Sequence, residues 1–230
     1  MFFWGWDPTY IIVLPALLLA IWAQLRVQSA YGRYSQVPIA SGMTGAQVAA
    51  EILRRNGLSA VEIERTEGML SDHYDPRTRV LRLSPGVYDG ASVASAGVAA
   101  HETGHALQDA QHYGPLALRS AMVPVTQFGS WLAWPLFLLG FFFHSGLMMQ
   151  LGILVFSAAV AFTVVTLPVE FNASSRALRL LQAEGLVTPD ELAGVRSVLG
   201  AAALTYVAAA ATAILELVRL LLLYNMRREE

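Results

Sequence analysis

Two histidines and a glutamate fall within five positions of an otherwise alanine-rich stretch, "VAAHETGHALQD", residues 98–109. On a helix, His101 and His105 project from one face about a turn apart, which is the separation that two imidazoles need to share a zinc ion. Glu102 stands beside the first histidine, where its carboxylate reaches a metal-bound water rather than the metal and can act as a general base. The spacing therefore predicts a site for metal-assisted hydrolysis.

The alternative is a pair of core histidines whose ring nitrogens are satisfied by neighbouring side chains. HExxH is short, and on the order of one random chain in a hundred of this size contains it. The context favours the metal, because the motif lies on a predicted helix, follows a predicted strand and has small apolar neighbours. The chain has no cysteine, so a metal here must be held by His, Asp or Glu.

A catalytic zinc also needs a third protein ligand and an open position. Glu170 is the strongest candidate, because it follows an apolar run closely and a carboxylate at the end of a membrane helix requires a partner. A glutamate from a separate helix would complete the His–His–Glu set of thermolysin-like enzymes. The alternative for Glu170 is a solvated position at the membrane interface.

Four other side chains could in principle bind the metal ion but are expected to have other roles. His112 would lie about 10 Å from His105 along a continuing helix, too far to share an ion, and the glycine and histidine of the metzincin pattern are absent. His73 and Asp75 fall in the turn-rich "SDHYDP", where surface roles are expected. His144 falls in a short connection between two apolar runs, where an interfacial position is expected.

The composition indicates a membrane protein. Of the 230 residues, 55% are hydrophobic and 14% charged, against about 25% charged in soluble domains. The net charge of −2 lacks the excess of positive charge that is typical of nucleic-acid-binding proteins. No basic residue precedes the first apolar run, so this run is expected to be a retained anchor rather than a cleaved signal peptide.

Four apolar runs approach the roughly 20 residues that cross a bilayer, at 10–25, 121–143, 147–166 and 199–224. We therefore expect a mainly α integral membrane protein with about four transmembrane helices and a small α+β zincin-like unit. The expected parts are an anchor (1–25), a catalytic region with the HExxH helix (26–120), two spans (121–166), a segment supplying the third ligand (167–198) and a final span with a tail (199–230).

Local signals mark the elements around the motif. Thr44 and Gly57 bracket a predicted helix, and two stretches, 60–68 and 78–84, alternate as half-buried strands do. The second strand, "RVLRLS", is expected to present a free edge to an extended substrate, the alternative being an internal strand that is already paired on both sides.

Helix start and stop signals of the same kind occur in the segment 167–198. Pro168 fits the first turn of a helix and Gly185 its end, and Thr188 with Glu191 has capping-box spacing. In the last span, Glu216 and Arg219 are three residues apart and are expected to pair, either as a structural ion pair or as part of a transport pathway.

Beyond these local signals, the combination "NGL…DHYDP…RVLRLS…GVAAHETGHALQDAQHY…LPVEFNASSRAL" resembles the membrane-bound neutral zinc metallopeptidases of bacteria, a family with a gluzincin-like HExxH…E pattern. The resemblance runs from about residue 41 to residue 178. It implies a multi-pass peptidase with one zinc ion, in which His101 and His105 are ligands, Glu102 is the base and Glu170 is the third ligand.

One position departs from the wider gluzincin pattern, which has an aspartate four residues after the glutamate ligand. Here that position is Ser174, so we expect the orienting of a histidine to fall to another residue, for which Asn172 is the candidate.

Arginine placement predicts which side of the membrane carries the site. Two spans separate the motif from Glu170, so both fall on one side. Nine arginines lie between residues 26 and 119 and three between 176 and 196, whereas the other side carries only Arg227 and Arg228. The positive-inside rule therefore predicts a multi-pass protein of the bacterial plasma membrane with a cytoplasmic site.

The expected function is cleavage of membrane or juxtamembrane polypeptides by a zinc-activated water, with the bilayer and the polypeptide substrate as partners. Two other classes are open. One is a zinc-binding regulator or scaffold without proteolytic activity. Such a protein would not need the general base Glu102. The other is part of a transporter, motivated by Glu216 and Arg219, although four spans without an inverted repeat do not favour it.

Overall fold

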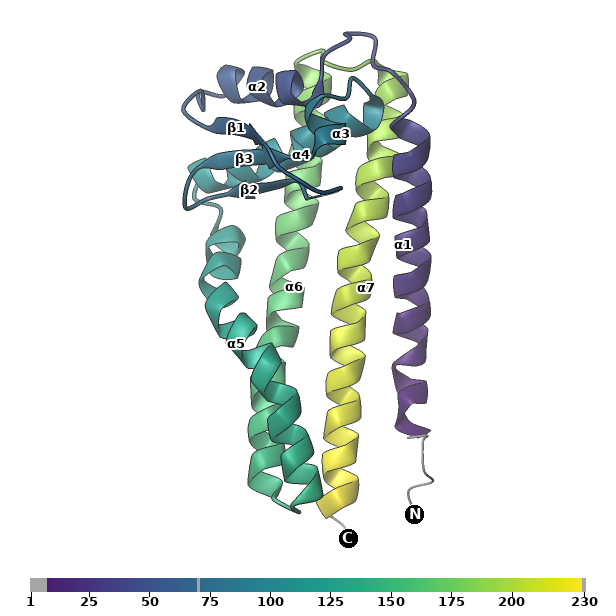
Figure 1. Cartoon of the computed structure of the whole chain (residues 1–230), viewed down its shortest axis with the longest axis vertical. Coiled ribbons are helices and arrows are strands. Elements are labelled where there is room, and N and C mark those ends of the chain that lie inside the picture. The colour runs from purple at the N-terminus through teal and green to yellow at the C-terminus, as the bar shows by residue number, and fades with distance from the viewer. Residues whose placement is uncertain (1–7, 70, 229–230) are drawn as a thin grey trace. The chain divides into compact units, whose positions relative to one another are not determined.

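The computed structural model describes residues 8–69 and 71–228 and is mostly helical with one small sheet (Figure 1). This confirms the expected class of a mainly α protein that contains a few strands. In chain order the elements are η1 (Pro8–Ile12), α1 (Leu14–Tyr34), α2 (Gly45–Arg55), β1 (Glu62–Arg65), β2 (His73–Asp75), β3 (Val80–Leu83), α3 (Pro85–Tyr88), α4 (Val93–Ala110), α5 (Gly114–Phe142), α6 (Gly146–Ala183) and α7 (Pro189–Arg228).

The chain forms two compact units. The mixed unit comprises residues 24–117 and 168–204 and contains the sheet, α2, α3, α4 and the adjoining parts of α1, α6 and α7. The helical unit comprises the described residues up to 23, residues 118–167 and those from 205 onward. The HExxH motif and Glu170 therefore belong to the same unit, the mixed one.

The sheet of the mixed unit has the strand order β1-β3-β2. Its middle strand, β3, pairs in parallel with β1 and antiparallel with β2, and Leu81 and Leu83 on it are fully buried. The expectation that residues 79–84 offer a free edge is therefore wrong, because a strand paired on both sides has no main-chain groups left for a substrate. The edge next to α4 is β2, which forms within the segment expected to be a turn-rich loop.

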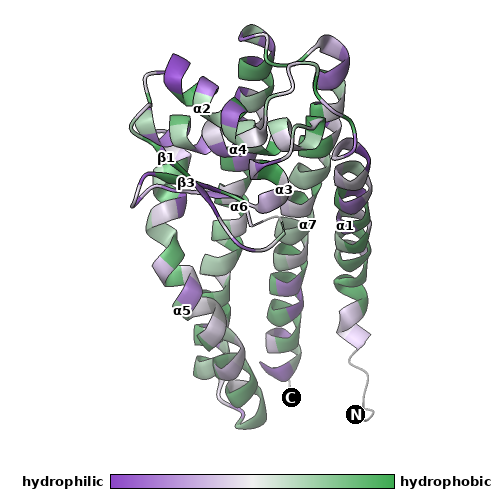
Figure 2. Ribbon diagram, turned by 45° about the horizontal axis from the view of Figure 1, so that its top comes forward, coloured by the Kyte–Doolittle hydropathy of each residue, from purple (hydrophilic) through white to green (hydrophobic). Residues whose placement is uncertain are grey.

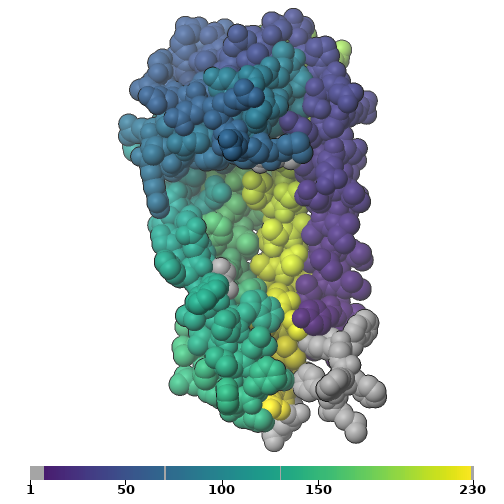
Figure 3. All heavy atoms as spheres, in the orientation of Figure 1, coloured from purple at the N-terminus to yellow at the C-terminus, as the bar shows by residue number. Residues whose placement is uncertain are grey.

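The helix that carries the motif, α4, is enclosed on almost all sides. Fourteen of its 18 residues are buried, so it shows none of the one-sided apolar pattern of a surface helix. Small residues let its neighbours approach, since Gly97 faces Val195 of α7 and Gly104 faces the backbone of Ala173 of α6. In Figure 3 the residues of α2 and the strands, in blue, cover much of the visible face of this unit.

Four of the local start and stop signals of the mixed unit are confirmed. Thr44 caps α2 in a capping box with Gln47, and Gly57 has a left-handed φ of 74° after the end of this helix. Gly185, with φ of 66°, ends α6, and the backbone N–H of Thr188 donates to the Glu191 carboxylate at 2.7 Å.

Pro168 does not begin a helix, contrary to expectation, because α6 continues through it from Gly146 to Ala183. A proline costs a helix one N–H, and within a long apolar helix the need to pair the remaining backbone groups keeps the helix intact. As a result Glu170 lies on the same helix as the apolar run 147–166.

In the part of the chain that the structure describes, α6 and α7 are long and apolar enough to cross a membrane. A third span is possible if the two halves of α5, Gly114–Gly129 and Trp131–Phe142, which are bent by 40°, count as one. The hydropathy colouring of Figure 2 shows this apolar character along α5, α6 and α7. The run 10–25, which falls in η1 and α1, is not among the helices that meet this criterion.

Glu216 and Arg219 pair as expected, within the helical unit. A guanidinium nitrogen of Arg219 donates to Glu216 Oε1, and Arg219 Nε donates to the hydroxyl of Thr9 at 3.0 Å. The guanidinium also lies 3.7 Å from the ring centre of Tyr10. With Arg219 only 4% exposed, these contacts make a buried ion pair that ties α7 to the N-terminal segment.

Candidate metal centre

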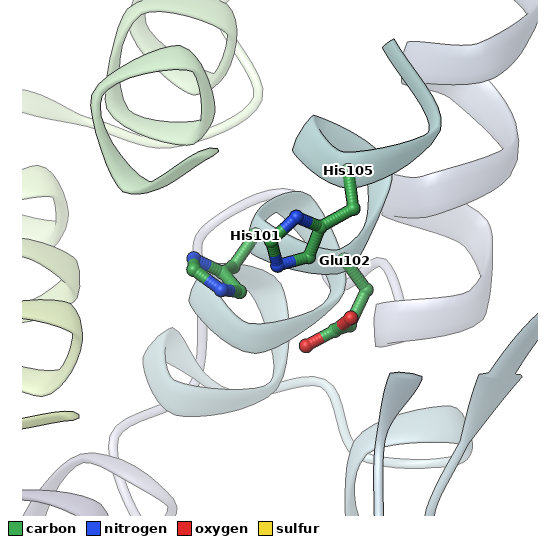
Figure 4. A group of neighbouring side chains, drawn as sticks. All are labelled: His101, Glu102 and His105. Carbon is green, nitrogen blue, oxygen red and sulfur yellow. The ribbon is translucent and has the colours of Figure 1, made fainter. Parts of the chain in front are cut away.

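Helix α4 brings the three residues of the motif together. Donor atoms of His101, Glu102 and His105 all lie within 4.8 Å of one another, and Glu102 and His105 are buried. Figure 4 shows the polar ends of the three side chains directed toward a common region beside the helix. The helical spacing of four residues produces this arrangement, because it stacks the two imidazoles on one face.

Glu170 of α6 meets the two histidines from the opposite helix. Its Oε2 lies 3.2 Å from His101 Nε2 and 3.6 Å from His105 Nε2, and the residue is only 2% exposed. The approach depends on Gly104, since a Cβ there would lie 2.8 Å from the carbonyl oxygen of Ala173. Two helices that are separated in sequence by the whole of α5 thus bring three donor atoms close together.

The separations of these donor atoms fit a zinc ion. Ligand atoms 2.0–2.1 Å from a tetrahedral zinc are about 3.3 Å from each other. The two Nε2–Oε2 distances are 3.2 and 3.6 Å. Two imidazole nitrogens and one carboxylate oxygen are also the donor set that catalytic zinc sites use, with one position left open for water.

The second nitrogen of each imidazole faces a polar partner. His101 Nδ1 lies 3.0 Å from Ser174 Oγ, and His105 Nδ1 lies 2.9 Å from Gln108 Oε1. The expectation that Ser174 leaves this task to another residue is wrong, because its hydroxyl reaches His101 directly. Asn172, the expected substitute, instead accepts a hydrogen bond from Gln108 at 3.0 Å. Gln108 was missed, and its only sequence signal is its place three residues after His105 on the same helix.

The site favours positive charge. Burial by itself lowers the pKa of His105, but the hydrogen bond to Glu170 and the charges of Glu102 and Glu170 outweigh burial and raise this pKa above the usual histidine value. Glu102 and Glu170 are both buried carboxylates beside the two histidines, and buried negative charges require a compensating cation. A divalent metal ion meets this requirement.

The other candidate ligands lie elsewhere. His73, at the exposed start of β2, contacts the carbonyl of Ser71, and Asp75 caps the next turn by accepting from the N–H of Arg77. His112 was expected on a continuing helix, but α4 ends at Ala110 and His112 has a left-handed φ of 52°. His144 lies in the connection between α5 and α6, as expected, and contacts Arg227. Within the described residues, none of these four joins the metal-binding group.

A buried HExxH helix met by a glutamate from a second helix is the arrangement of a gluzincin-like metal site. A protein family described as "Putative neutral zinc metallopeptidase" matches residues 9–225. The chain is also 49% identical over 219 residues to the "Putative membrane protease YugP" of Bacillus subtilis (strain 168), covering 95% of this chain and 97% of that protein. No solved structure matches the chain. The chain belongs to this family of zinc metallopeptidases.

The contact between α4 and α6 predicts a specific effect of one methyl group. Gly104→Ala should push α6 away from the histidines and strip most of the bound zinc, because the new Cβ meets the backbone of Ala173. Gly97→Ala is the matched control on the same helix, since its Cβ would meet the Val195 side chain of α7 at 3.0 Å and no backbone atom of α6. Both changes raise helix propensity equally, by about 1 kcal/mol. Zinc content per chain after dialysis is the measurement, and equal retention by both variants would contradict the crossing argument.

Proposed function

We propose that this protein is a membrane-embedded zinc endopeptidase, whose site is formed by His101, His105, Glu170 and Glu102. One observation carries the proposal: the Nε2 atoms of both histidines converge on Glu170 Oε2, at 3.2 and 3.6 Å, with Glu102 in the same cluster. His101, His105 and Glu170 are the three ligands of one zinc ion. Glu102, adjacent to the first ligand, is the general base.

A bound zinc ion supplies a Lewis acid that lowers the pKa of water and polarises a carbonyl group. Glu102 takes a proton from the water that attacks the scissile carbonyl carbon. As the C–N bond breaks, Glu102 delivers this proton to the leaving amine nitrogen. The carboxylate of Glu102 is buried, so its interactions with the reacting groups are stronger than they would be in water.

The two carboxylates should respond differently to the same change. Glu102→Gln should lower peptide hydrolysis by at least about 10²-fold while the protein still binds one zinc ion, because Glu102 is a base and not a ligand. Glu170→Gln should weaken zinc binding itself. Activity against a peptide library and metal analysis of the purified variants are the measurements.

Each outcome has a clear meaning. If Glu102→Gln loses zinc as readily as Glu170→Gln does, Glu102 has been given the wrong role. If Glu102→Gln binds zinc and the unaltered protein shows no hydrolysis that depends on Glu102, the protein is a zinc-binding regulator or scaffold.

An extended substrate adds to the sheet through main-chain hydrogen bonds, and the edge available for this is β2. Strands β2 and β3 contact α4, whereas β1 contacts α2. The Tyr74 hydroxyl of β2 donates to Asp109 of α4 at 2.9 Å, one turn beyond His105. Because Glu170 also lies on the helix that contains the apolar run 147–166, we expect substrates to be membrane or juxtamembrane polypeptides.

Crosslinking at the two edges of the sheet tests both statements. A photo-crosslinking residue at His73, on the β2 edge, should capture polypeptides in the inactive Glu102→Gln background. The same residue at Glu62, on the β1 edge, is the matched control, since both positions are exposed. Mass spectrometry then identifies what was captured. Preferential capture at Glu62 would reject the β2 edge, and capture of soluble proteins only would reject membrane substrates.

The topology that accompanies this function has four spans, with the motif and Glu170 on the cytoplasmic side. It is supported by the distribution of arginines, twelve in the two segments that contain the site and two at the C-terminal end. The bacterial plasma membrane is the location this implies.

Because the chain lacks cysteine, single cysteines report sidedness without background. Met69→Cys, at a side chain that is 90% exposed, and Asp190→Cys, also exposed, should resist a membrane-impermeant thiol reagent in intact cells and react once the membrane is opened. Asn225→Cys, beyond the last apolar run, should react in intact cells. Labelling of Met69→Cys in intact cells would place the site outside, and different behaviour of the first two cysteines would break the four-span topology.

A further inference from the structure

Gln108 is a fully buried amide with three polar partners on two helices. Its Oε1 lies 2.9 Å from His105 Nδ1, and its Nε2 donates to the carbonyl of Val169 at 2.8 Å and to Asn172 Oδ1 at 3.0 Å. Val169 and Asn172 stand on either side of Glu170 on α6. One side chain thus contacts one of the proposed ligands and the helix segment that carries another.

The orientation of this amide follows from groups with only one possible role. The carbonyl of Val169 can only accept a hydrogen bond, so the nitrogen of the Gln108 amide must face it and the oxygen must face His105. Asn172 leads to the same result, because Arg176 Nε, which can only donate, lies 2.7 Å from Asn172 Oδ1 and marks this atom as an acceptor. Two independent anchors therefore give one orientation.

This orientation determines the tautomer of His105. An amide oxygen accepts, so the proton of the neutral imidazole must be on Nδ1, and Nε2 carries the lone pair. Nε2 is the atom that faces Glu170 Oε2. The hydrogen bond of Gln108 therefore presents the atom that a metal ion requires, and it also holds the plane of the ring.

His101 lacks such a constraint. Its Nδ1 faces the hydroxyl of Ser174, which can donate or accept and therefore permits either tautomer. The two histidines of the motif are thus held unequally, His105 by a rigid amide and His101 by a rotatable hydroxyl.

We propose that Gln108 is the positioning residue of the metal centre, which fixes the tautomer and ring plane of His105 and holds the Glu170 segment of α6 at the distance that zinc binding requires. The proposal rests on the proposed function. A neutral amide performs the orienting task that a carboxylate performs in many zinc sites. It adds no further negative charge beside the buried carboxylates of Glu102 and Glu170.

The test measures zinc affinity, by competition with a chromogenic chelator, on purified full-length protein. Gln108→Met keeps the length of the side chain but removes the amide, and it should weaken zinc binding by about 10–100-fold. Gln108→Glu keeps an acceptor for His105 Nδ1 and should bind zinc more tightly than the methionine variant. Gln108→Leu replaces the methionine variant if that variant does not fold.

Two controls separate positioning from general loss of stability. Ser95→Ala removes a buried hydroxyl that donates to the carbonyl of Gly86. Since Ser95 lies ten residues before His105 on the same helix, this change should lower the melting temperature and leave zinc affinity unchanged. Ser174→Ala should weaken zinc binding less than Gln108→Met does, since a hydroxyl does not determine the tautomer of His101. The absorption bands of the Co²⁺-substituted protein should shift for Gln108→Met and not for Ser95→Ala.

Two results would overturn the proposal. One is unchanged zinc affinity in the folded Gln108→Met variant. The other is an equal loss in Gln108→Met and Gln108→Glu, which would mean that the bonds to α6 matter and the bond to His105 does not. Both results are independent of the proposed function, which fails if the unaltered protein binds no zinc or shows no hydrolysis that depends on Glu102.

Discussion

The close approach of α4 and α6 at Gly104 and Ala173 is the constraint on which the candidate metal centre depends. A Cβ at position 104 would lie 2.8 Å from a backbone oxygen, so only a glycine permits this crossing. The crossing brings Glu170 to within 3.2 and 3.6 Å of two imidazole nitrogens. Without it, the motif would supply two donors of the three that a catalytic zinc site needs. Gly104, the residue of HETGH that has no side chain, thus has the largest effect on the geometry of the site.

Burial makes the same region demanding, because each polar group placed there must find a partner. Helix α4 meets this demand with side chains on its neighbour. Gln108 bonds to Val169 and Asn172, and Ser174 contacts His101. These bonds hold the two helices together and direct the Nε2 atoms toward Glu170. The same hydrogen bonds therefore give the buried polar groups their partners and orient the two histidines of the candidate metal site.

The continuity of α6 through Pro168 adds a second constraint. Glu170 cannot shift along the axis of α6 relative to His101 and His105 unless the whole helix moves, including the apolar run 147–166. A side chain on a long helix is held more rigidly than one on a loop, which suits the proposed role of Glu170 as a ligand whose donor atom must stay within a few tenths of an ångström of its place. The same helix links the proposed chemistry to the proposed membrane location.

The sequence by itself determined those features that depend on neighbours along the chain. The caps at Thr44 and Thr188, the stops at Gly57 and Gly185, the pairing of Glu216 with Arg219 and the shared face of His101 and His105 all arise within a few residues, so local spacing suffices to predict them. Glu170 was identified as a candidate because a carboxylate at the end of an apolar run needs a partner, and the family resemblance supported it. Only the tertiary structure decided the middle position of β3, the continuity of α6 through Pro168 and the roles of Ser174 and Gln108. Each of these depends on which distant segment lies alongside, and a three-residue strand or a lone buried amide leaves no periodic signal in the sequence.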